Sequence, residues 1–312
     1  MRSIGLDVGG TKVLGVALDP GSPGVVVAEE RVPTPEGGDG LVDTLVGLLD
    51  GLAEGPATVG VGVPGLVDRV GTLHMGPHLR RLHDVPLARL LTERTGRPTV
   101  VDNDANCAAV GEQAAGAAQG AQEALVVTLG TGIGAGVITG GRLLRGANGF
   151  AGEPGHMVVD PNGPPCPCGK RGCWERFASG TGLGRLARDA AHGGRLDAAM
   201  ALAGGDPEAV RGEHVTAAAR AGDPESRVVL GELARWIAMG LANLVNVLDP
   251  EVIVIGGGLV EAADLLLPDV RTHFETLVMA GDRRPEVPIL PAVLGERAGA
   301  IGAAVLAAGA AA

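Results

Sequence analysis

Short apolar runs and segments with a helical period alternate along this chain. Residues 2–7 and 13–19 are apolar runs joined by the pair Gly9-Gly10, and this pattern predicts a β-hairpin with a glycine turn. A third strand is predicted over residues 25–32. Leucines spaced three and four residues apart then predict a helix over residues 41–52. The next predicted elements are a strand, a helix, a strand and a helix over residues 58–63, 87–94, 99–102 and 104–115.

The second half of the chain repeats this pattern. Two apolar runs, residues 125–129 and 135–139, flank a glycine-rich turn at residues 130–134, so the sequence indicates a weak internal duplication. A leucine stripe then predicts a helix that ends at Leu248, because Pro250 follows and proline stops helices. We interpret this stripe as core.

Three further segments complete the outline. Residues 252–255 predict a strand, and three glycines follow it. Residues 201–225 are rich in glycine, alanine and charge; we expect helical hairpins or loops at the periphery and assign them no chemistry. Residues 298–308 are mostly good helix formers, and we expect this helix to fold back on the first half of the chain.

These elements predict an α/β fold with two related lobes. The chain has 312 residues, more than a single hydrophobic core comfortably fills. We expect a small N-terminal lobe from residues 1–116 plus 298–312, a large lobe from residues 117–297, and a cleft between them.

Composition and charge narrow the classes of function. The formal net charge of -11 argues against a nucleic-acid partner, whose phosphates need a basic face. The N-terminus lacks an apolar signal core, and glycines or charges break the apolar runs before they reach a membrane span, so we expect a cytoplasmic protein without membrane contact. Thiols stay reduced there, so the four cysteines indicate metal binding or catalysis before disulfides.

Three glycine clusters follow predicted strands, at residues 9–10, 130–136 and 256–258. Ligands of α/β sheets meet the carboxyl ends of strands, and glycines let backbone amides approach phosphate oxygens closely. Each cluster alone is better explained as a hairpin turn. Together with Asp7, the three clusters favour a bound nucleotide.

One short region concentrates metal-binding side chains. His156, Cys166, Cys168 and Cys173 supply four donors, which suit a closed tetrahedral Zn²⁺ site. The C-x-C spacing departs from common zinc motifs, so a disulfide or an unligated cluster remains a serious alternative on these residues alone. Asp104 stands at the predicted start of a helix, where a simple N-cap is the default interpretation.

Five motifs stand in order along the chain: LDVGGTK (residues 6–12), NDAN (103–106), LGTG (129–132), EPGH (153–156) and CPCGKRGCWE (166–175). In this order and spacing they resemble the motif series of the ROK sugar kinases, especially bacterial glucokinases, and the resemblance runs nearly end to end. It implies the two-lobed actin-like, Hsp70-like and hexokinase-like ATPase fold, with duplicated β-β-β-α-β-α lobes and ATP in the cleft between them.

The resemblance also implies roles for residues on the nucleotide side. Asp7 would orient Mg²⁺ near the β- and γ-phosphates, and the glycine turns would supply phosphate-facing backbone. The residues implied for ATP are Asp7, Gly9, Gly10, Thr11, Lys12, Gly130, Thr131, Gly132, Gly256, Gly257 and Gly258.

On the sugar side, a carboxylate must accept the proton of a barely acidic hydroxyl, and the resemblance assigns this base to Asp104. The implied sugar-binding set is Gly65, Asn103, Asp104, Glu153, His156 and Glu175. The resemblance favours zinc on His156 and the three cysteines. Because four protein ligands leave no open position, we expect a structural ion that braces the sugar pocket rather than a catalytic one.

We therefore expect phosphorylation of glucose at its 6-hydroxyl by ATP, in a homodimer or homotetramer. The same chemistry on N-acetylglucosamine, N-acetylmannosamine or fructose remains open. A sugar-sensing repressor is a second alternative, although the phosphate motif starts at Leu6 and we expect no DNA-binding domain ahead of it. A polyphosphate-using kinase is the third, and the cysteine motif favours ATP over it.

Overall fold

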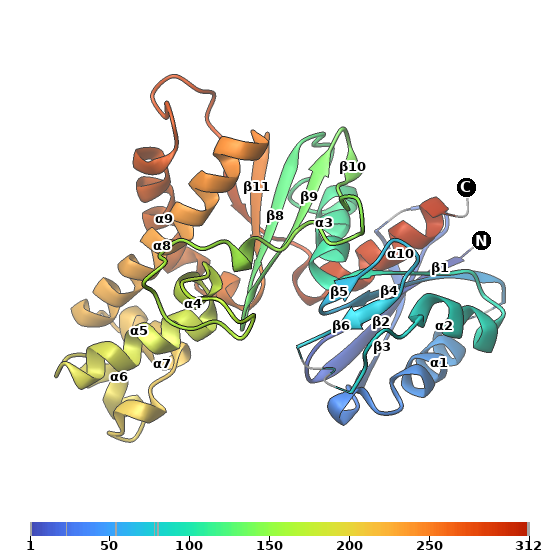
Figure 1. The fold of residues 1–312 in the computed structure, drawn as a ribbon, viewed down its shortest axis with the longest axis horizontal. Helices are drawn as coiled ribbons and strands as arrows, with labels where there is room; N and C mark the ends of the chain where they lie inside the picture. The colour runs from blue at the N-terminus through green and yellow to red at the C-terminus, as the bar shows by residue number, and fades with distance from the viewer. Residues whose placement is uncertain (1, 23, 54, 78, 80, 311–312) are drawn as a thin grey trace.

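The structure is a computed structural model that describes residues 2–22, 24–53, 55–77, 79 and 81–310, and it has two lobes (Figure 1). Each lobe contains one five-stranded mixed sheet covered by helices. The predicted α/β class and the two-lobed architecture are confirmed. The predicted lobe boundaries at residues 116 and 298 stay a prediction.

The first sheet has the strand order β3-β2-β1-β4-β7. Strands β1, β2 and β3 are antiparallel, and β4 and β7 run parallel to β1. Leucines on one face of α1 fill the core beneath this sheet. The elements of this part are β1 (Arg2–Val8), β2 (Lys12–Leu18), β3 (Val26–Pro33), η1 (Glu36–Gly38), α1 (Leu41–Leu52), β4 (Ala57–Val63), the hairpin β5 (Leu66–Val67) and β6 (Leu73–Met75), α2 (Leu87–Thr95), β7 (Thr99–Asn103) and α3 (Asp104–Ala115).

The second sheet has the order β10-β9-β8-β11-β12, which is the same topology. Strands β8, β9 and β10 are antiparallel, while β11 and β12 run parallel to β8. The duplication inferred from the two glycine turns is therefore confirmed at the level of topology. The bounds are β8 (Ala124–Leu129), β9 (Ile133–Thr139), β10 (Arg142–Leu143), β11 (Val252–Gly256) and β12 (Ile289–Pro291).

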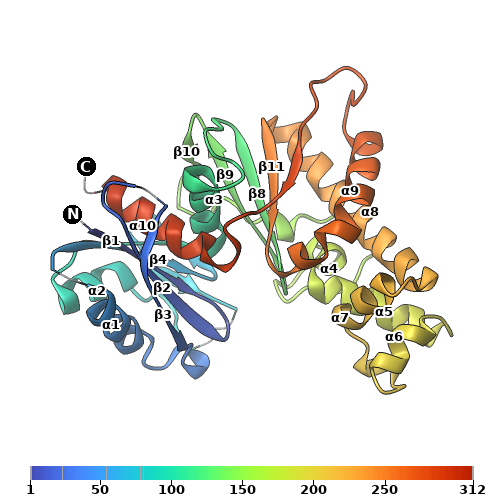
Figure 2. The ribbon, with the colours of Figure 1, turned by 180° about the vertical axis from the view of Figure 1, so that it is seen from behind.

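Most helices of the second lobe lie between β10 and β11 in sequence and gather on one side of its sheet (Figures 1 and 2). They pack around a core to which α8 contributes the leucine stripe. Their bounds are η2 (Pro154–His156), α4 (Glu175–Ala178), α5 (Gly180–His192), α6 (Asp197–Leu202), η3 (Pro207–Ala209), α7 (Gly212–Arg220) and α8 (Pro224–Leu248), and after β11 come η4 (Gly258–Ala262), α9 (Ala263–Leu277), η5 (Gly295–Arg297) and α10 (Ala298–Ala310).

Helix α8 corrects one expectation. By length and apolar composition alone, this helix would suffice to cross a membrane, whereas we expected every apolar run to stop short of that length. Glycines at positions 231 and 240 do not interrupt the helix. More than half of its apolar window is buried inside the protein, so its composition reflects its place in the core.

Helices α3 and α10 are exchanged between the lobes: each follows one sheet in sequence and packs on the other sheet. Helix α3 follows the last strand of the first sheet but packs on β8 and β9 of the second, whereas α10 follows the last strand of the second sheet and packs on β1 and β4 of the first. The two helices also pack on each other, as the views in Figures 1 and 2 show. Small residues permit this approach: a Cβ on Gly5, Gly60 or Gly302 would overlap a backbone carbonyl oxygen of the facing helix.

Candidate functional site

Asn103 and Asp104 form the junction between β7 and α3. Asn103 is the N-cap of the helix, and its Oδ1 accepts hydrogen bonds from the backbone N–H groups of Ala105 (2.9 Å) and Asn106 (3.1 Å). Its Nδ2 donates to the carbonyl oxygen of Gly65 at 3.1 Å. The capping role considered for Asp104 therefore belongs to Asn103, and Asp104 is the first residue of the helix.

Glu153 of the second lobe lies near both Asp104 and Glu175. Burial, followed by the charges of Asp104 and Glu175, raises the pKa of Glu153 to about 7. Glu175 begins α4, and its Oε2 accepts a hydrogen bond from the backbone N–H of Ile133 at 3.1 Å. Gly132 lies beneath that carboxylate, and a Cβ there would force the carboxylate of Glu175 to shift. The structure thus brings three of the predicted sugar-binding carboxylates together.

Asp7 lies near the end of β1, against the first turn of α10. A Cβ on Gly299 would stand 2.6 Å from its carboxyl carbon, so only glycine fits beside it. Burial, followed by the charge of Asp104, raises the pKa of Asp7 to about 8, while Lys12 opposes this effect. A carboxyl group held in this way loses its proton readily when a divalent cation binds beside it.

The four predicted metal ligands converge. The donor atoms of His156, Cys166, Cys168 and Cys173 all lie within 4.8 Å of one another. The Nδ1 atom of His156 is 3.7 Å from Cys166 Sγ, and Cys168 Sγ is 3.6 Å from Cys173 Sγ. Tetrahedral zinc with ordinary bond lengths places two sulfur ligands about 3.8 Å apart and a sulfur and a nitrogen about 3.6 Å apart.

These distances exclude the disulfide that was left open for the cysteines. A disulfide needs a sulfur separation of about 2.05 Å, and all four cysteines are free. Burial and then hydrogen bonds with the neighbouring thiols raise the pKa of Cys173 to about 12, so this residue becomes a thiolate at neutral pH only when a cation compensates the charge. The donor set fits a closed structural zinc site.

A buried tryptophan anchors the cysteine loop to the core. Trp174 is fully buried, its Nε1 donates to the carbonyl oxygen of Trp236 at 2.7 Å, and its ring lies over Gly240 of α8, which has no room for a Cβ. Trp174 stands between Cys173 and Glu175 in sequence. The same anchor therefore positions one predicted metal ligand and one carboxylate.

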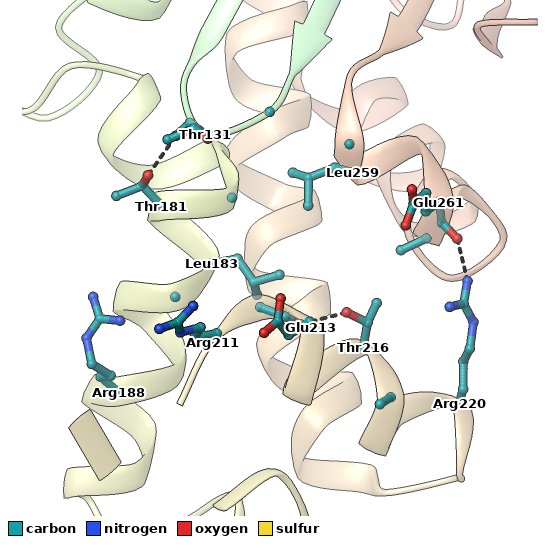
Figure 3. A pocket seen from close by; sticks show the side chains of 17 residues that line it. Thr131, Thr181, Leu183, Arg188, Arg211, Glu213, Thr216, Arg220, Leu259 and Glu261 are labelled. Carbon is teal, nitrogen blue, oxygen red and sulfur yellow. Dashed lines mark hydrogen bonds between the residues drawn. The ribbon is translucent and has the colours of Figure 1, made fainter. Parts of the chain in front are cut away.

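A cavity of about 740 Å³ opens in the second lobe (Figure 3). Its size lies in the range of small-molecule sites. Figure 3 shows Thr131 and Thr181 at one end, where Thr181 Oγ1 donates to the Thr131 carbonyl at 2.7 Å. The lining residues come from the β8–β9 turn, α5, α7 and η4, and include Gly130, Thr131, Gly180, Thr181, Leu183, Arg188, Arg211, Glu213, Thr216, Arg220, Gly258, Leu259 and Glu261.

The cavity contains some of the predicted nucleotide residues. Gly130, Thr131 and Gly258 line it, whereas Gly9, Gly10 and Thr11 lie on the β1–β2 turn of the other lobe and do not. Lys12 Nζ donates to Glu296 Oε1 at 2.6 Å on the surface. Gly132, Gly256 and Gly257 border the turns without lining the cavity, and Gly257 has a φ of 82° that favours glycine.

Residues 201–225 contain the helices expected at the periphery of the sheet, and one of them, α7, also lines the cavity. It forms one wall of the cavity and contributes Glu213, Thr216 and Arg220. Arg220 donates to the Glu261 carbonyl and to Asp264 Oδ1 at 3.0 Å, which ties α7 to η4. No sequence motif marks these residues, because polar side chains spaced three or four positions apart are typical of any exposed helix face.

A sequence profile described as the ROK family matches residues 3–310. The chain belongs to the ROK family. It is 38% identical over 310 residues to a glucokinase of Streptomyces coelicolor, covering 98% of this chain and 97% of that one. It is 32% identical over 314 residues to an N-acetylmannosamine kinase of Escherichia coli, covering 99% of each. The structure of a ROK family glucokinase from Streptomyces griseus in complex with glucose and AMPPNP superimposes with a TM-score of 0.87 at 38% identity, covering 99% of this chain and 100% of that one.

One polar cluster of this ROK chain was not predicted from the sequence. Asp102, which is buried, accepts hydrogen bonds from Arg145 Nε (2.6 Å) and Asn106 Nδ2 (2.8 Å). Asp102 directly precedes the NDAN motif and ends an apolar strand, which is the signal that could have drawn attention to it. Arg145 lies 43 positions away in a different lobe, and no spacing rule connects the two.

Proposed function

We propose that this ROK protein is a glucokinase that transfers the γ-phosphoryl group of ATP to the 6-hydroxyl of glucose. The observation that carries the proposal is the convergence of Asp104 and Glu175 on Glu153, whose pKa their charges raise, beside the zinc-type cluster. Neighbouring carboxylates and amides can accept hydrogen bonds from, and donate them to, the hydroxyls of a monosaccharide. The two Streptomyces glucokinases support glucose as the acceptor.

Asp104 is our candidate for the general base. As the first residue of α3 it lies at the positive end of the helix dipole, which favours its ionised form. Glu153 and Glu175 would accept hydrogens from sugar hydroxyls. Asn103 donates one Nδ2 hydrogen to Gly65 and retains the other for a hydroxyl, since a side-chain amide carries two donors.

The cavity in the second lobe is our candidate for the nucleoside of ATP. Gly130 and Thr131 lie at the end of β8, where backbone amides face a phosphate group, and Gly258 follows the end of β11. Gly9, Gly10, Thr11 and Lys12 would approach the phosphates from the other lobe. Asp7 would hold Mg²⁺, which neutralises charge on the transferring group when it is bound.

Zinc would be held by His156, Cys166, Cys168 and Cys173 and would supply a rigid crosslink rather than an open coordination position. His156 offers Nδ1 to this cluster, so its Nε2–H stays available for a sugar oxygen with the tautomer fixed. The zinc site thereby fixes the direction of a sugar-binding donor. We further propose that the protein works in the cytoplasm as a homodimer or homotetramer.

A coupled assay for sugar phosphate tests the proposed function. Glucose, N-acetylglucosamine, N-acetylmannosamine and fructose are each supplied with ATP or with polyphosphate, and the zinc content of the same preparation is measured. We expect turnover to be highest with glucose and ATP, and about one zinc per chain. Preference for another hexose would correct the substrate, and transfer to no hexose would favour a sugar-binding regulator instead.

A further inference from the structure

An ion pair joins the two lobes directly behind the candidate base. Arg145 lies just after β10 of the second sheet, and Asp102 lies on β7 of the first. Arg145 Nε donates to Asp102 Oδ2 at 2.6 Å, and the side chains are 32% and 6% exposed. The carboxylate is therefore buried, and its partner comes from the opposite lobe.

The other hydrogen bonds of Asp102 hold the segment that carries Asp104. Asp102 Oδ1 accepts from the backbone N–H of Asn103 at 2.8 Å and from Asn106 Nδ2 at 2.8 Å. These two donors stand on either side of Asp104 in sequence. Asn103 already caps the helix, so the charge of Asp102 is not needed as a cap.

The arginine belongs to the loop that delivers Glu153. This loop, residues 144–152, is also held by Arg69 of the first lobe, which donates to the Gly146 carbonyl. At its far end, a Cβ on Gly152 would lie 3.3 Å from Asn106 Oδ1. That oxygen is buried and has no hydrogen-bond partner in the described part of the chain. The polar cluster around Asp102 therefore contacts both ends of the loop.

We propose that Arg145 is a positioning residue for phosphoryl transfer, which acts through Asp102 to fix Asp104 relative to Glu153. The inference rests on the proposed function and adds a residue to its machinery. Phosphoryl transfer depends mainly on alignment and electrostatics. A base and a sugar-binding carboxylate carried by different lobes need a local contact that fixes their relative position, and the buried pair supplies one where the lobes meet.

Replacement of each partner separates positioning from simple stability. Arg145→Met leaves the Asp102 carboxylate buried without its cation, so the melting temperature should fall. Turnover should fall between about tenfold and a hundredfold, as expected for a misplaced reacting group, while glucose affinity changes less. Arg145→Lys should recover part of the turnover, because a cation returns without the planar geometry of arginine.

The double variant Asp102→Asn/Arg145→Met is the decisive comparison. A neutral asparagine removes the buried charge, so the melting temperature should return towards that of the wild type. Turnover should stay low, because the contact through which Arg145 fixes Asp104 relative to Glu153 is still missing. Recovery of melting temperature and turnover together would show that the pair is merely structural and would overturn the proposal.

A matched control and the wild type complete the experiment. Arg94→Met breaks an exposed ion pair with Asp43 (2.8 Å, 52% and 72% exposed) and should leave turnover unchanged. If the wild type transfers phosphate and Arg145→Met matches it in turnover, the positioning role is wrong and the proposed function stands. If the wild type transfers phosphate to no hexose, the positioning role and the proposed function are both wrong.

Discussion

Asp104 lies where the acidic residues of both lobes meet, since its charge raises the pKa values of Asp7 and Glu153. We predict that Asp104→Asn keeps the binding of glucose and ATP, because asparagine has the same shape. Turnover should fall about a hundredfold or more, within the usual range for a general base. Calorimetric titration and the coupled assay measure the two effects separately.

The control for this variant is Asp43→Asn on the exposed surface of α1, which removes a carboxylate without touching the acidic cluster. It should leave turnover at the wild-type value. Near-normal turnover of Asp104→Asn would remove this residue from the mechanism and would leave only its place at the start of the helix.

Glu153 makes stability depend on pH. Its carboxyl ionises near pH 4.5 when unfolded and at about pH 7 in the fold, so between these values only the folded protein holds the proton. Stability contributed by this group therefore falls as the pH rises from about 4.5 to 7 and then stays level. We predict that Glu153→Gln is more stable than the wild type at pH 8, by up to about 3 kcal/mol, and nearly equal to it at pH 4.5.

Thermal unfolding at a series of pH values measures this difference. Glu232→Gln, on the exposed surface of α8, serves as the control and should change the free energy of unfolding by no more than about 0.5 kcal/mol. A Glu153→Gln protein that is less stable than the wild type at pH 8 would contradict the assigned burial penalty. Under the proposed function, this carboxylate binds a sugar hydroxyl at a loss of stability.

Helix α10 depends on glycine where it crosses α3. A Cβ on Gly302 would overlap the backbone carbonyl of Cys107, which cannot move as a side chain can. We predict that Gly302→Ala lowers the free energy of unfolding by about 1–3 kcal/mol, although alanine is the better helix former by about 1 kcal/mol. Gly309→Ala on the same helix meets nothing within 4 Å and should not destabilise. Denaturant titration compares the two, and equal effects would contradict the close approach.

The cysteine loop is the second element whose role can be isolated. We predict that Cys168→Ser or chelation of the metal lowers glucose affinity about tenfold or more, because the loop no longer holds His156 and Glu175 in place. Cys107→Ala, on α3 away from the cluster, should keep its zinc and its affinity. Metal analysis and calorimetric titration provide both readouts, and unchanged affinity in metal-free protein would refute the bracing role.

The helices and strands themselves were largely predictable, but which of them pack against one another was not. Strands such as β1 and β2 carry strong apolar patterns and a glycine turn, so local sequence was enough. The exchange of α3 and α10 rests on Gly111 and Gly302 meeting across the fold, and nothing near either residue indicates the other. The same holds for α7, whose cavity-lining side chains look like an ordinary exposed helix face.

At the scale of the whole molecule, the candidate sugar residues come from both lobes while the cavity belongs to one. Gly65 and Asn103 lie with the first sheet, and Glu153 and Glu175 lie in the second lobe. The cavity is lined by residues between 130 and 262 alone. A ligand shifts the balance between two arrangements only if it binds one of them better. A sugar that contacts both lobes satisfies this condition, and a nucleoside confined to the cavity does not.

We therefore predict that glucose favours a more closed arrangement of the lobes and that adenosine, which lacks the phosphates able to reach the other lobe, does not. Small-angle scattering should show a lower radius of gyration with saturating glucose and no change with adenosine. Glucose at about a hundred times its Kd should also stabilise the fold by about 2.7 kcal/mol. Asp104→Asn should retain the glucose response, because closure needs binding and not proton transfer. A response to adenosine equal to that of glucose would show that closure does not depend on contacts that bridge the lobes. The assignment of the sugar to both lobes and of the nucleoside to the second lobe alone would then be wrong.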